Sequence, residues 1–113
     1  MNINVNKVKI IVTVPRDYTD KVREAMCNSG AGIIGNYSDC SMSTKCIGTF
    51  KPNDKANPYI GKNNELEFVE EDKLEVVCDV EKVKNVLLKL RESHPYEEPA
   101  IDIIPLLDES SFK

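Results

Sequence analysis

The residues best suited to chemistry lie in one short segment near the C-terminus, which we call the HPYEEP turn (residues 94–99). His94 offers an imidazole that titrates near neutral pH, and Glu97 and Glu98 offer hard oxygen donors. Tyr96 adds an aromatic ring with a hydroxyl group. These residue types suit a ligand pocket or the edge of a metal site. The alternative is structural: the prolines fix a turn, Tyr96 packs and His94 hydrogen-bonds a helix end. We favour the structural interpretation, because one histidine and two glutamates are few ligands for a metal.

A second candidate site is a glycine loop (residues 29–36), which is followed closely by Cys40. The loop reads Ser-Gly-Ala-Gly-Ile-Ile-Gly-Asn, and such a backbone must turn sharply or approach another group closely. Gly32 and Gly35 are therefore candidate ligand-binding residues. The spacing is similar to a dinucleotide-binding fingerprint, but this loop follows a predicted helix and enters a predicted strand, the reverse of the required order. Close chain packing is the favoured explanation, and an anion-binding nest is the alternative.

The four cysteines form no CxxC pair. Cys40 and Cys46 would lie about 20 Å apart on a continuous strand, so they could share a metal only if the chain folded back. Cys27 falls beside the apolar stripe of the first predicted helix, and Cys78 is in phase with Leu74 and Val76. Both are expected to be small core residues. A divalent metal ion is thus a weak prediction. Its candidate ligands are His94, Glu98 and Cys40.

The composition predicts one globular domain over residues 1–113. Hydrophobic residues make up 41% of the chain, which suffices for one core. With 15 basic and 19 acidic residues and no basic cluster, the chain is a poor candidate for binding nucleic acid. No apolar run approaches the roughly 18 residues of a membrane span. No signal-peptide pattern precedes the first predicted strand, so we expect a cytoplasmic protein with reduced thiols.

Hydrophobic periodicity predicts six elements in the order β-α-β-β-α-β. Strands are expected over residues 7–14, 37–50, 74–78 and 101–104, with an acidic tract over residues 70–72 before the third. Helices are expected after Thr19 and after Asp79 as N-caps, the first ending at Gly30 and the second by His94. A surface loop is expected over residues 51–64. Loops of this length have a functional role or form an oligomer contact more often than they have no role. Two helices covering one face of a mainly antiparallel four-stranded sheet make an α+β, ferredoxin-like βαββαβ sandwich.

Several motifs in order carry a resemblance to a known family. They are residues 30–40, Gly48-Thr-Phe-Lys-Pro52, Ala56-Asn-Pro-Tyr-Ile-Gly61 and residues 94–100. Together they closely resemble the YqfO-type domain inserted in the middle of Nif3-like dinuclear-metal proteins. The HPYEEP turn is also similar to a segment of the CutA divalent-cation tolerance proteins. The resemblance covers a core of about residues 7–107.

The resemblance implies a PII/CutA-like fold with an extended hairpin arm between the second and third strands. It also implies a homo-oligomer, with a trimer favoured. In Nif3-like proteins the flanking domains build the two-metal site from several histidines and glutamates, whereas this chain has only His94. The family often carries histidine at the positions of Ile33 and Asp39, which weakens a metal or catalytic site near the glycine loop.

Three functions compete. The first is a non-catalytic binding module whose subunit clefts, lined by the glycine loop, Cys40 and the HPYEEP turn, hold a divalent metal ion or small ligand. The second is a structural module that docks a separate Nif3-like partner protein. The third, a metal-dependent hydrolase fragment, would need ligands that this chain lacks. We therefore expect no enzyme activity.

Overall fold

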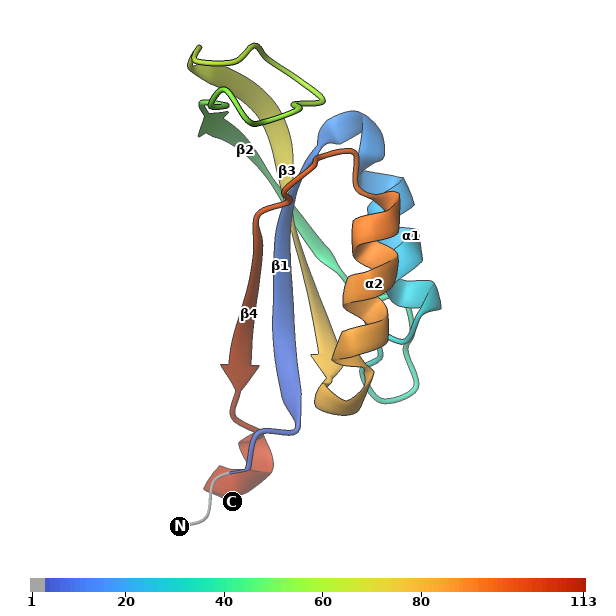
Figure 1. Cartoon of the computed structure of the whole chain (residues 1–113). Coiled ribbons are helices and arrows are strands. Elements are labelled where there is room, and N and C mark those ends of the chain that lie inside the picture. The colour runs from blue at the N-terminus through green and yellow to red at the C-terminus, as the bar shows by residue number, and fades with distance from the viewer. Residues whose placement is uncertain (1–3) are drawn as a thin grey trace.

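The structure, a computed structural model, describes residues 4–113 and places two helices on one face of a four-stranded sheet (Figure 1). The strands are β1 (Lys7–Pro15), β2 (Met42–Phe50), β3 (Glu67–Asp79) and β4 (Ile101–Leu106), and the helices are α1 (Thr19–Asn28) and α2 (Val83–Ser93). The sheet order is β2-β3-β1-β4, and every neighbouring pair is antiparallel. The predicted ferredoxin-like α+β fold is confirmed, although residues 1–3 of the expected domain lie outside the described range. No helix among the described residues has the length and apolar character needed to cross a bilayer.

The core lies between the sheet and the helices because alternate residues of the two central strands are apolar. Each fully buried aliphatic side chain contributes about 1.5–3 kcal/mol by leaving water. The most deeply buried members are Ile10, Val12, Val14, Val22, Met26, Leu74, Val76, Val86 and Leu90. Cys78 is buried among them, and Cys27 packs against the cluster. The prediction of a core position is confirmed for Cys78, whereas Cys27 is half-buried at the edge of the core.

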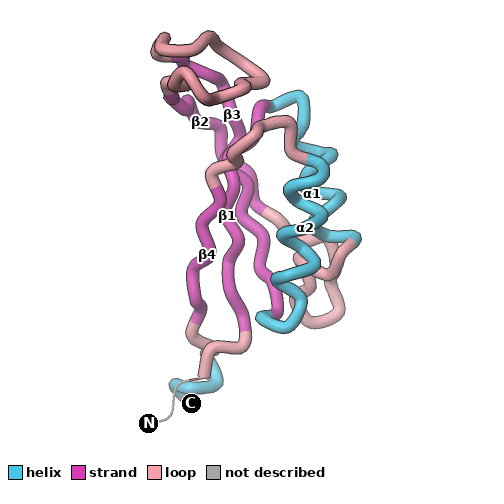
Figure 2. The backbone as a smooth tube through the Cα atoms, viewed as in Figure 1, coloured by secondary structure: helices cyan, strands magenta, loops and turns pink. Residues whose placement is uncertain are grey.

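β2 and β3 project beyond the rest of the sheet as a hairpin arm. β1 pairs with β3 only as far as Glu71, and the four preceding residues of β3 pair with β2 alone. The long loop (residues 51–66) folds at the tip of this arm (Figure 2). The molecule is accordingly elongated, with principal extents of 52 × 28 × 24 Å. The extended hairpin arm that the family resemblance implies is present.

The two ends of the sheet differ in what they carry. We call them the terminal end, where β1 starts and β4 stops, and the loop end, where the HPYEEP turn and the long loop lie (Figure 1). Lys7 pairs with Leu106, so both ends of the described chain leave the sheet together at the terminal end. α2 runs from the terminal end to the loop end and delivers the HPYEEP turn there.

Both predicted N-caps are wrong for the same reason. A short 3-10 turn precedes each helix, Arg16–Tyr18 before α1 and Val80–Lys82 before α2. Thr19 therefore lies inside the first turn of α1, and its hydroxyl donates to Asp72 Oδ2 at 2.8 Å. Asp79 precedes the second 3-10 turn and makes no side-chain capping bond. Each 3-10 turn leads directly into its helix, so no capping side chain is needed.

Three strand limits also differ from expectation. β3 begins at Glu67 instead of Leu74, because the acidic tract continues the strand by pairing with β2. The strand predicted over residues 37–50 begins at Met42, because Asp39 has a left-handed φ of 56° that interrupts extended backbone. Met42 is 61% exposed instead of half-buried, since nothing covers that part of an edge strand. β4 continues through Pro105, and an edge strand tolerates proline because one side of its backbone makes no ladder bonds.

Candidate functional site

His94 holds the HPYEEP turn against the end of β1. Its side chain is 6% exposed; Nε2 donates to the carbonyl oxygen of Thr13 at 2.8 Å, and Nδ1 accepts from the N–H of Tyr96 at 3.1 Å. An accepting Nδ1 places the ring proton on Nε2. Burial lowers the pKa of His94, and the hydrogen bond to Thr13 opposes that shift. Both nitrogens are engaged within the chain, so the geometry fits the structural interpretation of this residue.

Tyr96 lies at the centre of an aromatic cluster at the loop end. Its ring centroid is 5.0 Å from that of His94, 6.0 Å from Phe50 on β2 and 6.5 Å from Tyr59 on the long loop. These tilted contacts join three segments that are distant in the sequence. The Tyr96 hydroxyl is buried beside the Glu71 carboxylate, and no other group of residues 4–113 offers it a hydrogen bond. Burial and the neighbouring Glu71 carboxylate raise the pKa of this phenol.

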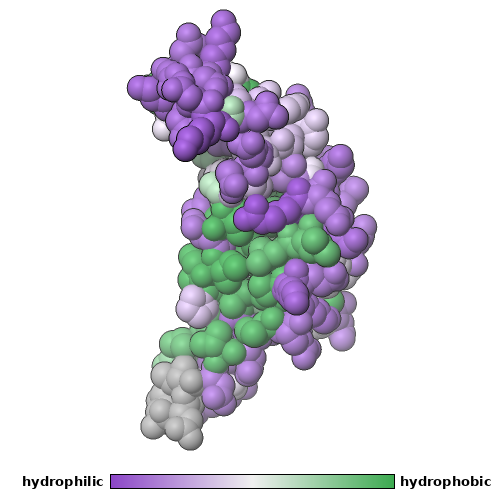
Figure 3. All heavy atoms as spheres, in the orientation of Figure 1, coloured by the Kyte–Doolittle hydropathy of each residue, from purple (hydrophilic) through white to green (hydrophobic). Residues whose placement is uncertain are grey.

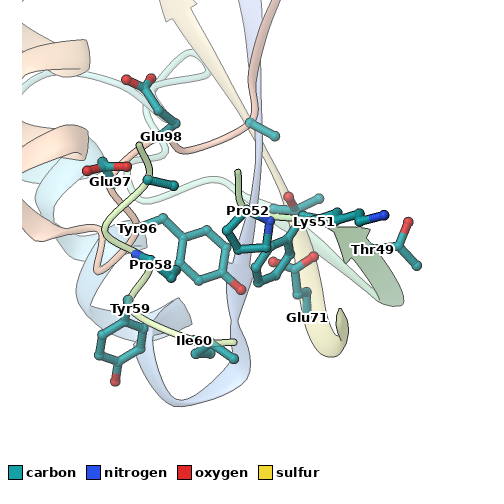
Figure 4. Close-up of a pocket in the computed structure, with 14 residues that line it drawn as sticks. Thr49, Lys51, Pro52, Pro58, Tyr59, Ile60, Glu71, Tyr96, Glu97 and Glu98 are labelled. Atoms are coloured by element: carbon teal, nitrogen blue, oxygen red, sulfur yellow. The ribbon is translucent and has the colours of Figure 1, made fainter. Parts of the chain in front are cut away.

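The cluster borders a cavity of about 300 Å³ (Figure 4). β2 and the long loop supply most of its apolar wall, and the HPYEEP turn supplies the opposite wall. The residues lining it are Thr13, Thr49, Phe50, Lys51, Pro52, Ala56, Pro58, Tyr59, Ile60, Glu71, Tyr96, Glu97, Glu98 and Ala100. Its size is at the lower end of the range for small-molecule pockets. The pocket lies within one chain, so it does not depend on a neighbouring copy.

Glu71 is the buried charged residue of this pocket. It lies on β3 opposite Cys46 and is only 4% exposed. Gly48 pairs with Val69, two residues before Glu71 on β3, and a Cβ at Gly48 would overlap the Glu71 carboxylate. Glycine at this strand position therefore makes room for the acid. The sequence prediction missed Glu71, although a lone glycine inside a strand signals a close approach of this kind.

We expect Gly48→Ala to lower the free energy of unfolding by about 1–3 kcal/mol, the usual cost of overpacking a well-filled site. The added methyl group would lie 2.9 Å from the Glu71 carboxyl carbon, so the acid must move. Urea unfolding of the chain measures the change. In a Glu71→Ala background the same substitution should cost much less, because the clash is gone. Equal costs in both backgrounds would contradict this explanation of Gly48.

Glu97 and Glu98 stand at the rim of the pocket. Both are exposed, and Glu97 Oε1 accepts from the backbone N–H of Asn57 at 3.3 Å, which ties the long loop to the HPYEEP turn. Tyr59 on the same loop also contacts Tyr18, with the two ring centroids 5.9 Å apart. The predicted site residues Tyr96, Glu97 and Glu98 thus share one pocket. Figure 4 shows Tyr96 with its hydroxyl turned towards Glu71.

The glycine loop lies at the terminal end of the sheet, away from this pocket. The Gly32 N–H donates to the carbonyl oxygen of Val77 near the end of β3, whereas His94 bonds Thr13 at the other end of β1. Gly32 has φ of 77°, and a Cβ there would lie 2.9 Å from Cys27 Sγ and from the Cys40 carbonyl oxygen. This is the close packing that the sequence favoured for the loop.

Gly35 and Cys40 have local roles in the same loop. Gly35, with φ of 57°, sits in a tight turn closed by reciprocal backbone hydrogen bonds of 2.9 Å between Ile34 and Tyr37. The Cys40 N–H donates to the Gly32 carbonyl oxygen at 2.8 Å, and its half-buried thiol faces nearby carbonyl oxygens. Within one chain, Gly32, Gly35 and Cys40 are therefore not brought together with the HPYEEP turn.

The proposed metal ligands do not converge within one chain. His94 is engaged through both nitrogens, Glu98 is at the pocket rim, and Cys40 is at the opposite end of the sheet. Among residues 4–113, no group of three or more His, Cys, Asp or Glu side chains could hold a metal ion.

Comparison with known sequences gives a partial match to longer proteins. No protein-family model matches the chain. Proteins named GTP cyclohydrolase 1 type 2 homolog from Halalkalibacterium halodurans and Bacillus subtilis are 50% and 49% identical to it over 101 and 98 residues. These matches cover 89% and 87% of this chain but 27% and 26% of the relatives. The chain therefore spans about a quarter of the length of the curated relatives it matches.

Solved structures show the same partial likeness in three dimensions. A Bacillus cereus protein related to NIF3 matches with a TM-score of 0.79 at 35% identity, over 94% of this chain and 27% of that one. CutA from Synechococcus elongatus matches with a TM-score of 0.70 at 13% identity, over 98% of this chain and 87% of that one. The CutA proteins share this fold. In the CutA-like fold described here, the pocket occupies the loop end and the glycine loop the terminal end.

Proposed function

We propose that this chain is a non-catalytic, CutA-like binding module that joins copies of itself and holds a small ligand at the HPYEEP turn. The observation that carries the proposal is the pocket of about 300 Å³ into which the buried Glu71 and the Tyr96 hydroxyl both face. Apolar walls with a few polar groups are the usual form of a small-molecule site. Four free cysteines are in keeping with a reducing cytoplasm, where we place the protein.

Assembly is supported by the two free edges of the sheet. β2 and β4 each pair on one side only, and each carries exposed apolar residues, with Ile47 68% exposed on β2 and Ile103 43% exposed on β4. Figure 3 shows an apolar area over β4 and the adjoining part of α2. An exposed apolar strand edge is a template for pairing with another chain. We propose that β2 of one copy pairs with β4 of the next, a head-to-tail contact that closes into a ring.

A trimer is the ring that the family resemblance favours, and subunit clefts are where it places a divalent ion. Of the three candidate ligands, Glu98 has an exposed carboxylate at the loop end of the sheet. Cys40 lies at the terminal end of the sheet in the same copy. A shared metal site would therefore need Cys40 of one copy to approach Glu98 of another. The carboxylate supplies a hard donor and the thiolate a soft one, a mixed set that suits zinc better than magnesium.

Native mass spectrometry and thermal unfolding of the purified chain test this function. We expect a discrete oligomer and a raised melting temperature with a bound small molecule or with zinc, because a ligand that binds the folded state stabilises it. A monomer whose melting temperature responds to no metal, nucleotide or amine would overturn the proposal.

The second candidate is a module that docks a separate Nif3-like partner. Its support is the length of the sequence relatives, of which the chain matches 26–27%, so that similar segments exist within larger proteins. Purification of the tagged chain from its native cells tests this function. A Nif3-like protein recovered at equal molar amount would favour docking over a free-standing ligand-binding ring.

A further inference from the structure

Glu71 is a buried acid without a counter-ion. Its side chain is nine-tenths or more buried, since the residue is 4% exposed. Among residues 4–113 no Lys, Arg or His nitrogen lies within 4.0 Å of its carboxylate, although neighbouring Glu70 and Asp72 both pair with Arg16. A buried carboxylate is costly unless a cation or several hydrogen bonds compensate it. The pocket therefore contains a buried carboxylate with no cation beside it among the described residues, and Gly48 leaves the space that this carboxylate occupies.

Tyr96 presents a second polar group to the same cavity. Its hydroxyl is buried and faces the Glu71 carboxylate, the one group among residues 4–113 that is placed to accept from it (Figure 4). Together the two side chains offer three oxygen atoms to one ligand, two on the carboxylate and one on the phenol. Such a pair can accept N–H donors, and charge-assisted bonds to a carboxylate are the strongest of this kind.

The remaining walls favour a flat or apolar organic body. Phe50, Tyr59 and Tyr96 supply aromatic faces, and Pro52 and Pro58 supply apolar edges. Aromatic faces attract organic cations. One carboxylate and one phenol are too few ligands for a bare divalent ion, which needs at least four donors.

The charged residues around the pocket also favour a positively charged ligand. Glu97 and Glu98 add two carboxylates at the rim, against the one ammonium of Lys51. Carboxylates that outnumber cations raise the local concentration of a positively charged ligand and repel an anionic one.

We propose that the pocket binds a small organic cation, a protonated amine or an amidinium, whose N–H groups donate to the Glu71 carboxylate and the Tyr96 hydroxyl oxygen. Its apolar body lies between the aromatic and proline walls. This inference rests on the proposed function, because it assigns a ligand class to the pocket on which that function depends. The cavity volume limits the ligand to a small molecule.

Three probes of nearly the same shape test the charge requirement: benzamidinium, benzamide and benzoate. NMR titration of the labelled chain gives their dissociation constants and shows which residues respond. We expect benzamidinium to bind at least about tenfold tighter than benzamide, a difference of about 1.4 kcal/mol, and benzoate to bind weakest. The shifted resonances should belong to the pocket and not to the glycine loop.

Glu71→Gln keeps the shape of the side chain and removes its charge. We expect benzamidinium affinity to fall about tenfold or more, while benzamide affinity stays within about twofold. Without ligand, the variant should melt at the same or a higher temperature, because a buried charge with no cation beside it has been removed. Glu70→Gln, which changes the exposed neighbour on the same strand, is the matched control and should leave both affinities unchanged.

Tyr96→Phe provides a second variant that keeps the ring. It should weaken benzamidinium by a smaller factor than Glu71→Gln and leave the cavity walls intact. The charge inference is overturned if benzamide or benzoate binds as tightly as benzamidinium, or if Glu71→Gln leaves benzamidinium unaffected. Those results would leave the binding module standing, because a ligand still occupies the pocket. If none of the three probes perturbs a pocket residue, the inference and the ligand-binding part of the proposed function both fail.

Discussion

Replacing His94 with alanine should lower the free energy of unfolding by about 2–4 kcal/mol, a large share of the stability of a domain of this size. The substitution removes the hydrogen bond to the Thr13 carbonyl oxygen, deprives the Tyr96 N–H of its acceptor and leaves a cavity beneath the turn. Urea or thermal unfolding followed by circular dichroism measures the change. We expect the variant to unfold in one cooperative transition, because β1 and the HPYEEP turn are held together at this point.

The conservative variant separates hydrogen bonding from packing. His94→Gln can still donate to Thr13, so it should recover part of the stability that His94→Ala loses. Arg91→Ala, an exposed change in the last turn of α2 three residues before His94, should have little effect and serves as the control. A His94→Ala protein as stable as the original chain would contradict the structural role assigned to this histidine.

His94 should also make stability depend on pH in a defined direction. Burial lowers its pKa in the folded chain, whereas in the unfolded chain it titrates near its ordinary value of about 6.5. Between those two values the unfolded state binds the proton and the folded state does not. The free energy of unfolding is therefore highest above about pH 7. It declines as the pH falls through about 6.5 towards the pKa of His94 in the folded chain.

This pH dependence is open to a clean measurement because His94 is the single histidine of the chain. Unfolding curves between pH 5.5 and 7.5 should show stability rising with pH, by at most about 1.4 kcal/mol per unit for one proton. The slope should vanish in His94→Gln. A slope of the opposite sign would mean that the folded chain stabilises the charged imidazole.

Ile47→Lys on β2 should convert the proposed oligomer to monomers at micromolar concentration. Ile47 is 68% exposed in the single chain, so the change should leave the fold intact. In the assembly it would place a lysine on a strand edge that pairs with the next copy, and lysine on an edge is a common device against pairing. We expect the dissociation constant to rise at least about a hundredfold, the effect of about 2.7 kcal/mol.

Ile103→Lys on β4 tests the other side of the same contact and should have the same result. Leu88→Lys makes the same change at a 55% exposed position of α2 and should leave the oligomer intact. Mixing the two edge variants gives a further check, since a head-to-tail contact joins the unaltered β4 of one to the unaltered β2 of the other. They should then form dimers but no closed ring. Edge variants that remain fully oligomeric would exclude this mode of assembly.

The sequence predicts the fold well because the apolar spacing and the tertiary packing agree. Val86 and Leu90 lie on the predicted stripe of α2 and are fully buried, and the period of two in β1 matches its buried face. The cap predictions for Thr19 and Asp79 fail because spacing does not distinguish an N-cap from a residue at the edge of a 3-10 turn.

The site is only partly predictable from sequence. Tyr96, Glu97 and Glu98 are adjacent in the chain, so the motif itself places them together, and they do share a pocket. Glu71 lies in a run of acidic residues, and nothing in that run marks it as the buried one. Its burial depends on Gly48 of another strand, a tertiary contact that only the strand register reveals.

The position of the two chain ends affects how the domain can be combined with other proteins. Lys7 and Leu106 are paired neighbours, so joining both ends to a host loop closes that loop over a short span. The entropy cost of loop closure rises only slowly with the number of residues enclosed, and a short span keeps the host's own geometry nearly unchanged. The pocket lies at the far end of the sheet. A host protein can therefore acquire or lose this unit with little thermodynamic penalty to itself and without obstructing the pocket.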